Sequence, residues 1–435
     1  MPLTHGEGRT TDREILRLAV PAFAALVAEP LFLLTDYAIV GRLGTSALGA
    51  LSVAGTILAT IVNLCVFLAY GTTAAVARQV GAGNHRQAVQ RGMDGVWLAA
   101  AIGVGVVVVC WPLAPGLVGL IDAPPEVTAD AITYLRISLV GTPAMLIVLA
   151  GTGVLRGLQD TVTPLAVSVG GFALNAALNA WFVLGLGWGL AGSAWGTVAA
   201  QSLAAGAYLI VVVRGARRVR ASLRPDPAGI KASGTAGIAL LIRTVCLRIV
   251  LVTATVIAAR LGIAEVAAHG ITTQVWTLLA FALDAIAIAG QALTGKLLGA
   301  GDVLGARRVT GRMVMWGVVS GVVLGLAVIG CRPFIPGIFA AESAVAAQID
   351  AVLWTVALFQ PIAGVVFVLD GVLIGAGDQR YLAWAAAVTT LAYLPFALLA
   401  GSLVGLWLAI GVWMLARLAT LGLRARGDAW LVSGA

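Results

Sequence analysis

Acidic side chains inside long apolar stretches are the residues of this sequence whose type could do chemistry. Glu29 and Asp36 stand in the first such stretch, seven residues apart, so two turns of a helix place them on one face. An ionised group in mid-membrane costs roughly 2.5–3.5 kcal/mol on insertion scales, and burial disfavours its charged form. Asp36 is therefore predicted to carry a proton, or to bind Na⁺ where other oxygens converge. The alternatives are that Asp36 reaches water at the interface and that Glu29 pairs with a neighbouring helix.

Amide and hydroxyl groups in two later stretches could assist such a carboxylate. Asn175 and Asn179 are four residues apart and share a helix face, and Thr197 lies in the following stretch. These groups could relay protons through water or coordinate sodium. The alternative is plain hydrogen bonding between helices, worth about 0.6–2 kcal/mol.

The second half of the chain carries its own intramembrane charges: Asp284 and Asp370, which are further candidates for proton or cation binding, and Arg248. Arg248 is expected to pair with a carboxylate, because an unpaired charge is expensive there. Pro21 is predicted to bend the first helix, since proline lacks the backbone N–H that a helix interior needs. The three histidines are scattered and the four cysteines form no CxxC pair, so no metal site is predicted.

The elements that position these groups follow from composition. The chain has 435 residues, of which 60% are hydrophobic and 11% charged, with a mean hydropathy of +1.01. A soluble domain is typically about 25% charged, which excludes that class. Six apolar runs lie between residues 15 and 213 and six between 236 and 423. We predict twelve transmembrane helices in an all-α polytopic membrane protein, with an N-lobe (1–213), a basic cytoplasmic linker (214–235) and a C-lobe (236–435).

The net charge of +8 is explained by the membrane topology, because lysine and arginine concentrate on the inner side. With the N-terminus inside, all but four of the 27 lysines and arginines fall on the inner side, the exceptions being Arg42, Arg136, Arg260 and Arg332. Both termini are therefore predicted to be cytoplasmic, and no nucleic-acid partner is expected.

An internal repeat relates the two halves. A shift of 218 residues superimposes Arg42-Leu43-Gly44 on Arg260-Leu261-Gly262, and Gly153-Val154-Leu155 on Gly371-Val372-Leu373. Because each half has six spans, both start on the same side, and the two six-helix bundles are predicted to be related by an axis along the membrane normal.

These stretches resemble the multidrug and toxic compound extrusion (MATE) family. The resemblance rests on Asp36–Gly44, Gly153–Thr161, Leu174–Val183, Gly192-Ser193-Ala194 and Leu369–Asp378. The sequence around Asp284 and around Asp370-Gly371 is most similar to the DNA-damage-inducible protein F branch of the family. It implies a V-shaped fold of two lobes. It also implies a cation-site carboxylate at Asp36 beside Asn175, Asn179 and Thr197, a bend at Pro21, and a second cation-site acid at Asp370. Many members have Asp where Asn179 stands, so this site has one carboxylate fewer.

The resemblance further implies an antiporter, not an enzyme, that exports cationic or amphipathic small molecules in exchange for H⁺ or Na⁺ and needs no cofactor. We expect a monomer in contact with membrane lipids, in the plasma membrane of a prokaryote. The alternatives within the superfamily are a flippase for a lipid-linked precursor and a metabolite exporter. A membrane-embedded enzyme would need a dense cluster of His, Cys or acidic residues facing one leaflet, and the sequence shows none. A major-facilitator carrier usually has an acidic and basic signature between its second and third helices, which the Arg78–Arg91 loop does not resemble.

Overall fold

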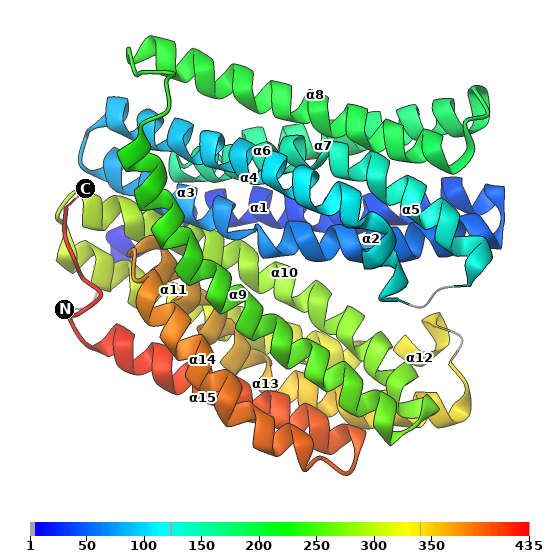
Figure 1. The fold of residues 1–435 in the computed structure, drawn as a ribbon. Coiled ribbons are helices and arrows are strands. Elements are labelled where there is room, and N and C mark those ends of the chain that lie inside the picture. Colours follow the sequence, from blue (N-terminus) through cyan, green and yellow to red (C-terminus); the bar gives the residue numbers. More distant parts are fainter. Residues whose placement is uncertain (1–4, 122–123, 340, 435) are drawn as a thin grey trace. The chain divides into compact units, whose positions relative to one another are not determined.

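The computed structural model describes residues 5–121, 124–339 and 341–434, apart from the side chains of residues 5–10, 29 and 31. Every regular element in these ranges is helical (Figure 1). The helices of the first half are α1 (His5–Val40), the 3-10 turn η1 (Gly41–Leu43), α2 (Thr45–Leu64), α3 (Phe67–Gly81), α4 (His85–Gly119), α5 (Pro125–Val140), α6 (Thr142–Gly157), α7 (Val162–Ala180), the π-helical turn η2 (Trp181–Gly185) and α8 (Gly189–Arg218). Those of the second half are α9 (Pro227–Leu261), α10 (Ile263–Gly299), α11 (Val303–Cys331), α12 (Ile335–Ile338), α13 (Ser343–Gly375), α14 (Gln379–Leu398) and α15 (Leu403–Arg426).

The predicted all-α polytopic membrane fold is confirmed. Eleven segments of the described chain are long and apolar enough to cross a membrane, and α5 with α6 makes a twelfth span that is bent by 48°. The break falls at Gly141, and Pro143 follows in the first turn of α6, where its missing N–H leaves no helical hydrogen bond unmade. α2 and α3 together make one span, as the apolar run 47–77 predicts.

The chain forms two compact units, each with its own internal packing. One comprises residues 24–237, and the other comprises residues 238–434 together with the described start of α1, up to Phe23. The predicted N-lobe (1–213) includes this start of α1, whereas the structure groups it with the second unit. Asp12 explains the grouping, because its carboxylate accepts hydrogen bonds from Arg312 Nε (2.7 Å) and Trp316 Nε1 (2.9 Å) of α11.

α1 is continuous through Pro21, and the unit boundary lies two residues later. The bend expected at Pro21 therefore involves no break in the helix and stays a prediction. α8 and α9 extend into both ends of the expected linker 214–235, which leaves residues 219–226 as the non-helical connection.

The 218-residue repeat is visible in how glycines pack within each unit. A Cβ added to Gly153 would collide with the backbone of Ala69, and one added to Gly371 with that of Ala287, which is 218 residues beyond Ala69. Close approach of helix backbones therefore requires glycine at equivalent places in both units. The shared backbone plan accounts for the matching loop lengths.

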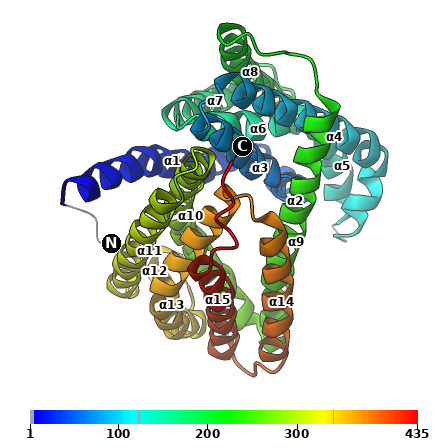
Figure 2. The same cartoon turned by 90° about the vertical axis from the view of Figure 1, so that its left-hand side faces the viewer.

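The second unit is built around α13, which packs against α10, α11 and α15. Figure 2 shows these helices nearly end on, with α14 beside α15. The C-terminal half of α13 is buried almost without interruption, from Val366 to Gly375, and Asp370 is the charged residue within it. Any partner for Asp370 must therefore come from the helices around α13.

Candidate functional site

Asp36 lies near the end of α1, with its side chain only 5% exposed. Its Oδ1 atom accepts a hydrogen bond from Asn179 Nδ2 of α7 at 2.6 Å and another from Ser193 Oγ of α8 at 2.9 Å. The end of α1 thus meets two consecutive helices from far along the chain, α7 and α8, at one carboxylate inside the first unit. The interface position considered for Asp36 does not fit this burial.

The hydrogen bonds continue beyond the carboxylate. Asn179 Nδ2 also donates to Asn175 Oδ1 (2.8 Å), and Asn175 Nδ2 donates to Thr197 Oγ1 (3.1 Å). The structure therefore brings together all four residues that sequence reasoning grouped, Asp36, Asn175, Asn179 and Thr197. Asn175 and Asn179 are both buried, as their spacing of one helical turn on one face of α7 requires.

Local backbone features make room for this network. Gly196 of α8 faces Asn179 so closely that a Cβ at position 196 would overlap the amide oxygen. Directly after Asn179 the chain passes through Ala180 into the π-helical turn η2, and such wide turns are frequent at functional sites. Asn179 Oδ1 is buried and meets no donor among the described residues, so the site holds an unused acceptor.

Sequence reasoning missed two members of this site, Ser193 and Tyr134. Ser193 is fully buried, and the signal that could have found it is its position in the Gly192-Ser193-Ala194 stretch. Tyr134 of α5 lies against Ser193, Ser138 and Thr197 and near enough to Asp36 to sense its charge. The available signal was that the hydroxyl of a buried tyrosine usually needs a hydrogen-bond partner.

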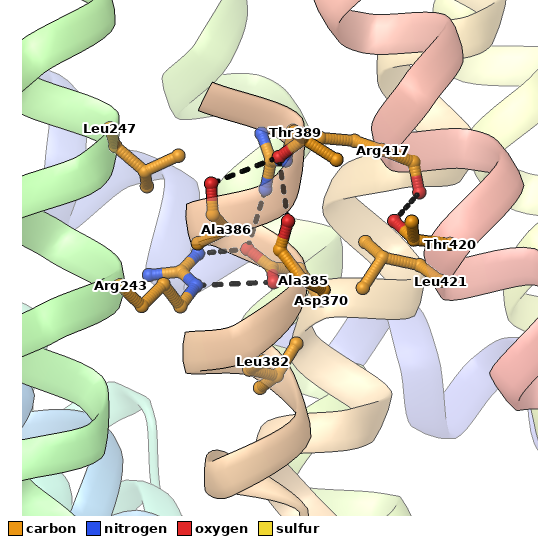
Figure 3. Close-up of a pocket in the computed structure, with 10 residues that line it drawn as sticks. All are labelled: Arg243, Leu247, Asp370, Leu382, Ala385, Ala386, Thr389, Arg417, Thr420 and Leu421. Carbon is orange, nitrogen blue, oxygen red and sulfur yellow. Dashed lines mark hydrogen bonds and ion pairs between the residues drawn. The ribbon is translucent and has the colours of Figure 1, made fainter. Parts of the chain in front are cut away.

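Asp370 is held in a different way. Arg243 of α9 and Arg417 of α15 both bind its carboxylate (Figure 3). Arg243 contributes two donors, Nε at 3.2 Å and Nη2, and Arg417 Nη2 lies 3.0 Å from Oδ2. All three side chains are buried. Asp284 of α10, which is half-buried, interacts electrostatically with Arg417 and completes a cluster of two acids and two bases.

The pairing predicted for Arg248 is wrong, because its side chain is exposed and Arg243 makes the ion pair instead. The two arginines are five residues apart on α9, which turns them about 140° away from each other. Arg417 was also missed, although it stands inside the last apolar run, and a charge within such a run is itself the signal.

The cation site that the resemblance implies at Asp370 does not fit this geometry. A coupling ion would need the carboxylate oxygens, and two guanidinium groups already occupy them. The side chain of Glu29 lies outside the described part of the chain, so its predicted charge partner is untested. No group of three or more metal-binding side chains (His, Cys, Asp or Glu) occurs among the described residues.

Comparison of the sequence with known proteins identifies the family of this chain. The model of the MatE family matches residues 21–181 and 240–399, one stretch in each half of the chain. The chloroplastic protein DETOXIFICATION 45 of Arabidopsis thaliana is 30% identical over 441 residues, which cover 94% of this chain and 78% of that protein. DNA damage-inducible protein F of Escherichia coli is 26% identical over 298 residues, which cover 67% of this chain and 65% of that protein.

Solved structures show the same fold. A MOP superfamily transporter from Pyrococcus furiosus superposes with a TM-score of 0.86 at 22% sequence identity, covering 96% of this chain and 95% of that one. The similarity therefore extends over nearly the whole chain, including the helices that carry both buried aspartates.

Proposed function

The chain belongs to the MatE family of multidrug and toxic compound transporters, and on this premise we propose that it exports organic cations and related xenobiotics in exchange for protons. Members of the family are transporters, so the chain is not an enzyme. In this proposal Asp36 takes up a proton on the outer side and releases it on the inner side, and its charge decides whether the drug is held.

One observation carries the proposal: Asp36 is buried and its hydrogen-bond partners, Asn179 and Ser193, are neutral. Burial favours the neutral carboxyl, whereas two donated hydrogen bonds favour the carboxylate. Neither partner carries a positive charge that would fix the charge of the carboxyl, so both protonation states are accessible. A carboxyl that changes charge at modest cost is what exchange of a proton for a cation requires.

The network supports a change of partners on protonation. A protonated Asp36 is a hydrogen-bond donor, and the unused acceptor Asn179 Oδ1 lies in the same site. A shift of α1 relative to α7 and α8, with bending at Pro21, would then reshape the drug site. One charge that crosses 100 mV supplies about 2.3 kcal/mol, a useful driving force per proton.

Ethidium efflux from cells that express Asp36→Asn tests this role. The variant keeps the shape and the oxygen of Asp36 but cannot ionise, so we expect efflux to stop. Asp428→Asn makes the same change at an exposed position and is expected to leave efflux intact. Wild-type efflux in Asp36→Asn would refute the role of this carboxyl.

Purified protein in vesicles, with pH and sodium gradients imposed separately, identifies the coupling ion. We expect transport to follow the pH gradient alone. The oxygens of Asp36, Asn175, Asn179 and Thr197 are of the type that binds Na⁺, so transport driven by sodium alone would replace the proton in this scheme.

We further propose that both termini are cytoplasmic, which the distribution of lysine and arginine supports, and that the protein acts as a monomer among lipids in the plasma membrane of a prokaryote. The relatives include chloroplast proteins of a plant as well as a bacterial protein. Single cysteines introduced at positions 10 and 433 of a variant whose four native cysteines are replaced by serine test the orientation with a membrane-impermeant reagent. Labelling from outside would reverse the proposed orientation.

A further inference from the structure

A pocket opens at one end of the unit formed by residues 24–237. It lies where the end of η1, the start of α2, the first half of α5 and the turn before α8 meet, and it is wide enough to admit water. Ser46, Asp130, Thr133, Tyr134 and Trp188 are among the residues that line it. This end carries few arginines and lies opposite the basic Arg78–Arg91 loop, so the charge distribution makes it the outer end.

The inner wall of this pocket touches the Asp36 site. Tyr134 lines the pocket, yet it is only 4% exposed, and its hydroxyl lies beside Ser193 and Thr197. Ser193 Oγ in turn donates to Asp36 Oδ1 at 2.9 Å. Two hydroxyl groups thus lie between a space open to water and the buried carboxyl.

The repeat offers an internal comparison for this connection. The residues 218 positions beyond Asp36, Tyr134 and Ser193 are Ala254, Val352 and Gly411. The second unit has the same backbone plan, but these three positions carry neither the acid nor the two hydroxyls. The series of hydroxyl groups therefore accompanies the carboxyl that it reaches and is not a by-product of the fold.

We propose that this pocket is the outer proton entry of Asp36, with Tyr134 and Ser193 as the relay. A hydronium ion from the outer solution gives a proton to Tyr134 Oη in the pocket and leaves as water, while the tyrosine passes its own proton to Ser193 Oγ. Ser193 passes its proton to Asp36 Oδ1, and rotation of the two hydroxyls restores the starting arrangement. No bond other than O–H is made or broken. This inference rests on the proposed proton coupling and adds the path that the proton takes.

Few other charged groups lie near this path among the described residues. In η1, Arg42 is exposed and directly precedes Leu43, which lines the pocket. On α5, Asp130 stands at the pocket mouth and Glu126 is exposed, while Arg136 stacks on Trp111 at 4.9 Å. On α1, Tyr37 is exposed beside Asp36. Asp130 lies one turn before Tyr134 on the same face, where a carboxylate attracts protons from the outer solution.

Tryptophans introduced at the pocket test the path. Ser46→Trp and Thr133→Trp fill the pocket, and Ala264→Trp and Ala351→Trp place the same side chain at the repeat-equivalent positions as matched controls. Tyr134→Phe removes the relay hydroxyl with little change in volume. The measurement is the initial rate of ethidium efflux from loaded right-side-out vesicles after the outer solution is acidified, together with ethidium affinity of the purified protein.

We expect the two pocket variants and Tyr134→Phe to slow acid-driven efflux by about tenfold or more, because a positioned proton donor contributes at least that much to proton transfer. The ethidium affinity of the two tryptophan variants and the efflux of both controls should match wild type. Wild-type rates in all three variants would overturn the path and leave the role of Asp36 standing. Efflux by the unmutated protein that ignores the pH gradient would overturn the proposed coupling, and the path with it.

Discussion

The two buried aspartates of this chain are held by opposite kinds of partner. Asp36, in the unit of residues 24–237, accepts hydrogen bonds from an amide and a hydroxyl, whereas Asp370, in the other unit, binds two arginines. A carboxylate between two guanidinium groups is committed to its charge, because neutralising it would leave cations buried. A carboxyl among neutral donors can gain or lose a proton at much lower cost. The repeated backbone thus carries one acid among neutral donors and one acid in an ion cluster.

The asymmetry extends to the equivalent positions of the repeat. Asp370 corresponds to Thr152, whose Oγ1 donates to the hydroxyl of Tyr208 at 2.9 Å, and Asp36 corresponds to Ala254. Each unit therefore keeps its acid at a place where the other has a neutral side chain. The two units therefore share a backbone plan, whereas their buried polar side chains differ in position and in charge.

Asparagine substitution at each aspartate should give the largest difference in stability between the two sites. Asp370→Asn removes the anion that both buried guanidinium groups bind, and is expected to lower stability by about 3–5 kcal/mol. Asp36→Asn keeps an oxygen for Asn179 and Ser193 and should cost about 1 kcal/mol or less while efflux stops. Thermal unfolding of the purified proteins, followed by tryptophan fluorescence, measures both. Equal stability of the two variants would remove the distinction.

Two arginines on α9 provide the next test. Arg243→Met removes one of the partners of Asp370 and should cost about 3 kcal/mol, since Arg417 remains. Arg248→Met, five residues later at an exposed position, should change stability by about 0.5 kcal/mol or less. The same unfolding measurement applies. A larger loss at position 248 would mean that the ion cluster is assigned to the wrong arginine.

Crowding at the Asp36 network should have an intermediate effect. Gly196→Ala pushes a methyl group into the amide oxygen of Asn179, with an expected cost of about 1–3 kcal/mol and loss of efflux. Gly206→Ala, on the same helix but facing open space, is the control and should be neutral or slightly stabilising. Efflux and unfolding are measured on both, and normal efflux in Gly196→Ala would show that the network tolerates displacement.

The smallest effect is expected at the neutral counterpart of Asp370. Thr152→Val keeps the side-chain shape and removes the hydrogen bond to Tyr208, so its cost should be about 0.6 kcal/mol. The same unfolding experiment measures the loss of stability in Thr152→Val and in Asp370→Asn. The difference between the two losses shows how much more the ion cluster contributes to stability than the neutral hydrogen bond does. Similar costs would mean that charge contributes little to the Asp370 cluster.

The amino-acid sequence by itself determines much of this molecule. Hydropathy predicts all twelve spans, and the break between α5 and α6 lies within a single apolar run. The spacing of Asn175 and Asn179 places both amides on one face of α7, and they do join the network of Asp36. These features are local, because burial in lipid and the period of a helix act on each segment independently of its neighbours.

Only the tertiary structure decided which charges meet. In the structure Asp370 pairs with Arg243 and Arg417, and not with Arg248. Ser193 and Tyr134 belong to the Asp36 site, and the start of α1 belongs to the second unit. Each of these facts depends on how a helix is rotated about its axis and how closely its neighbours approach. A sequence lists the side chains of a helix in order, but the packing of all the helices together selects the face that turns inward.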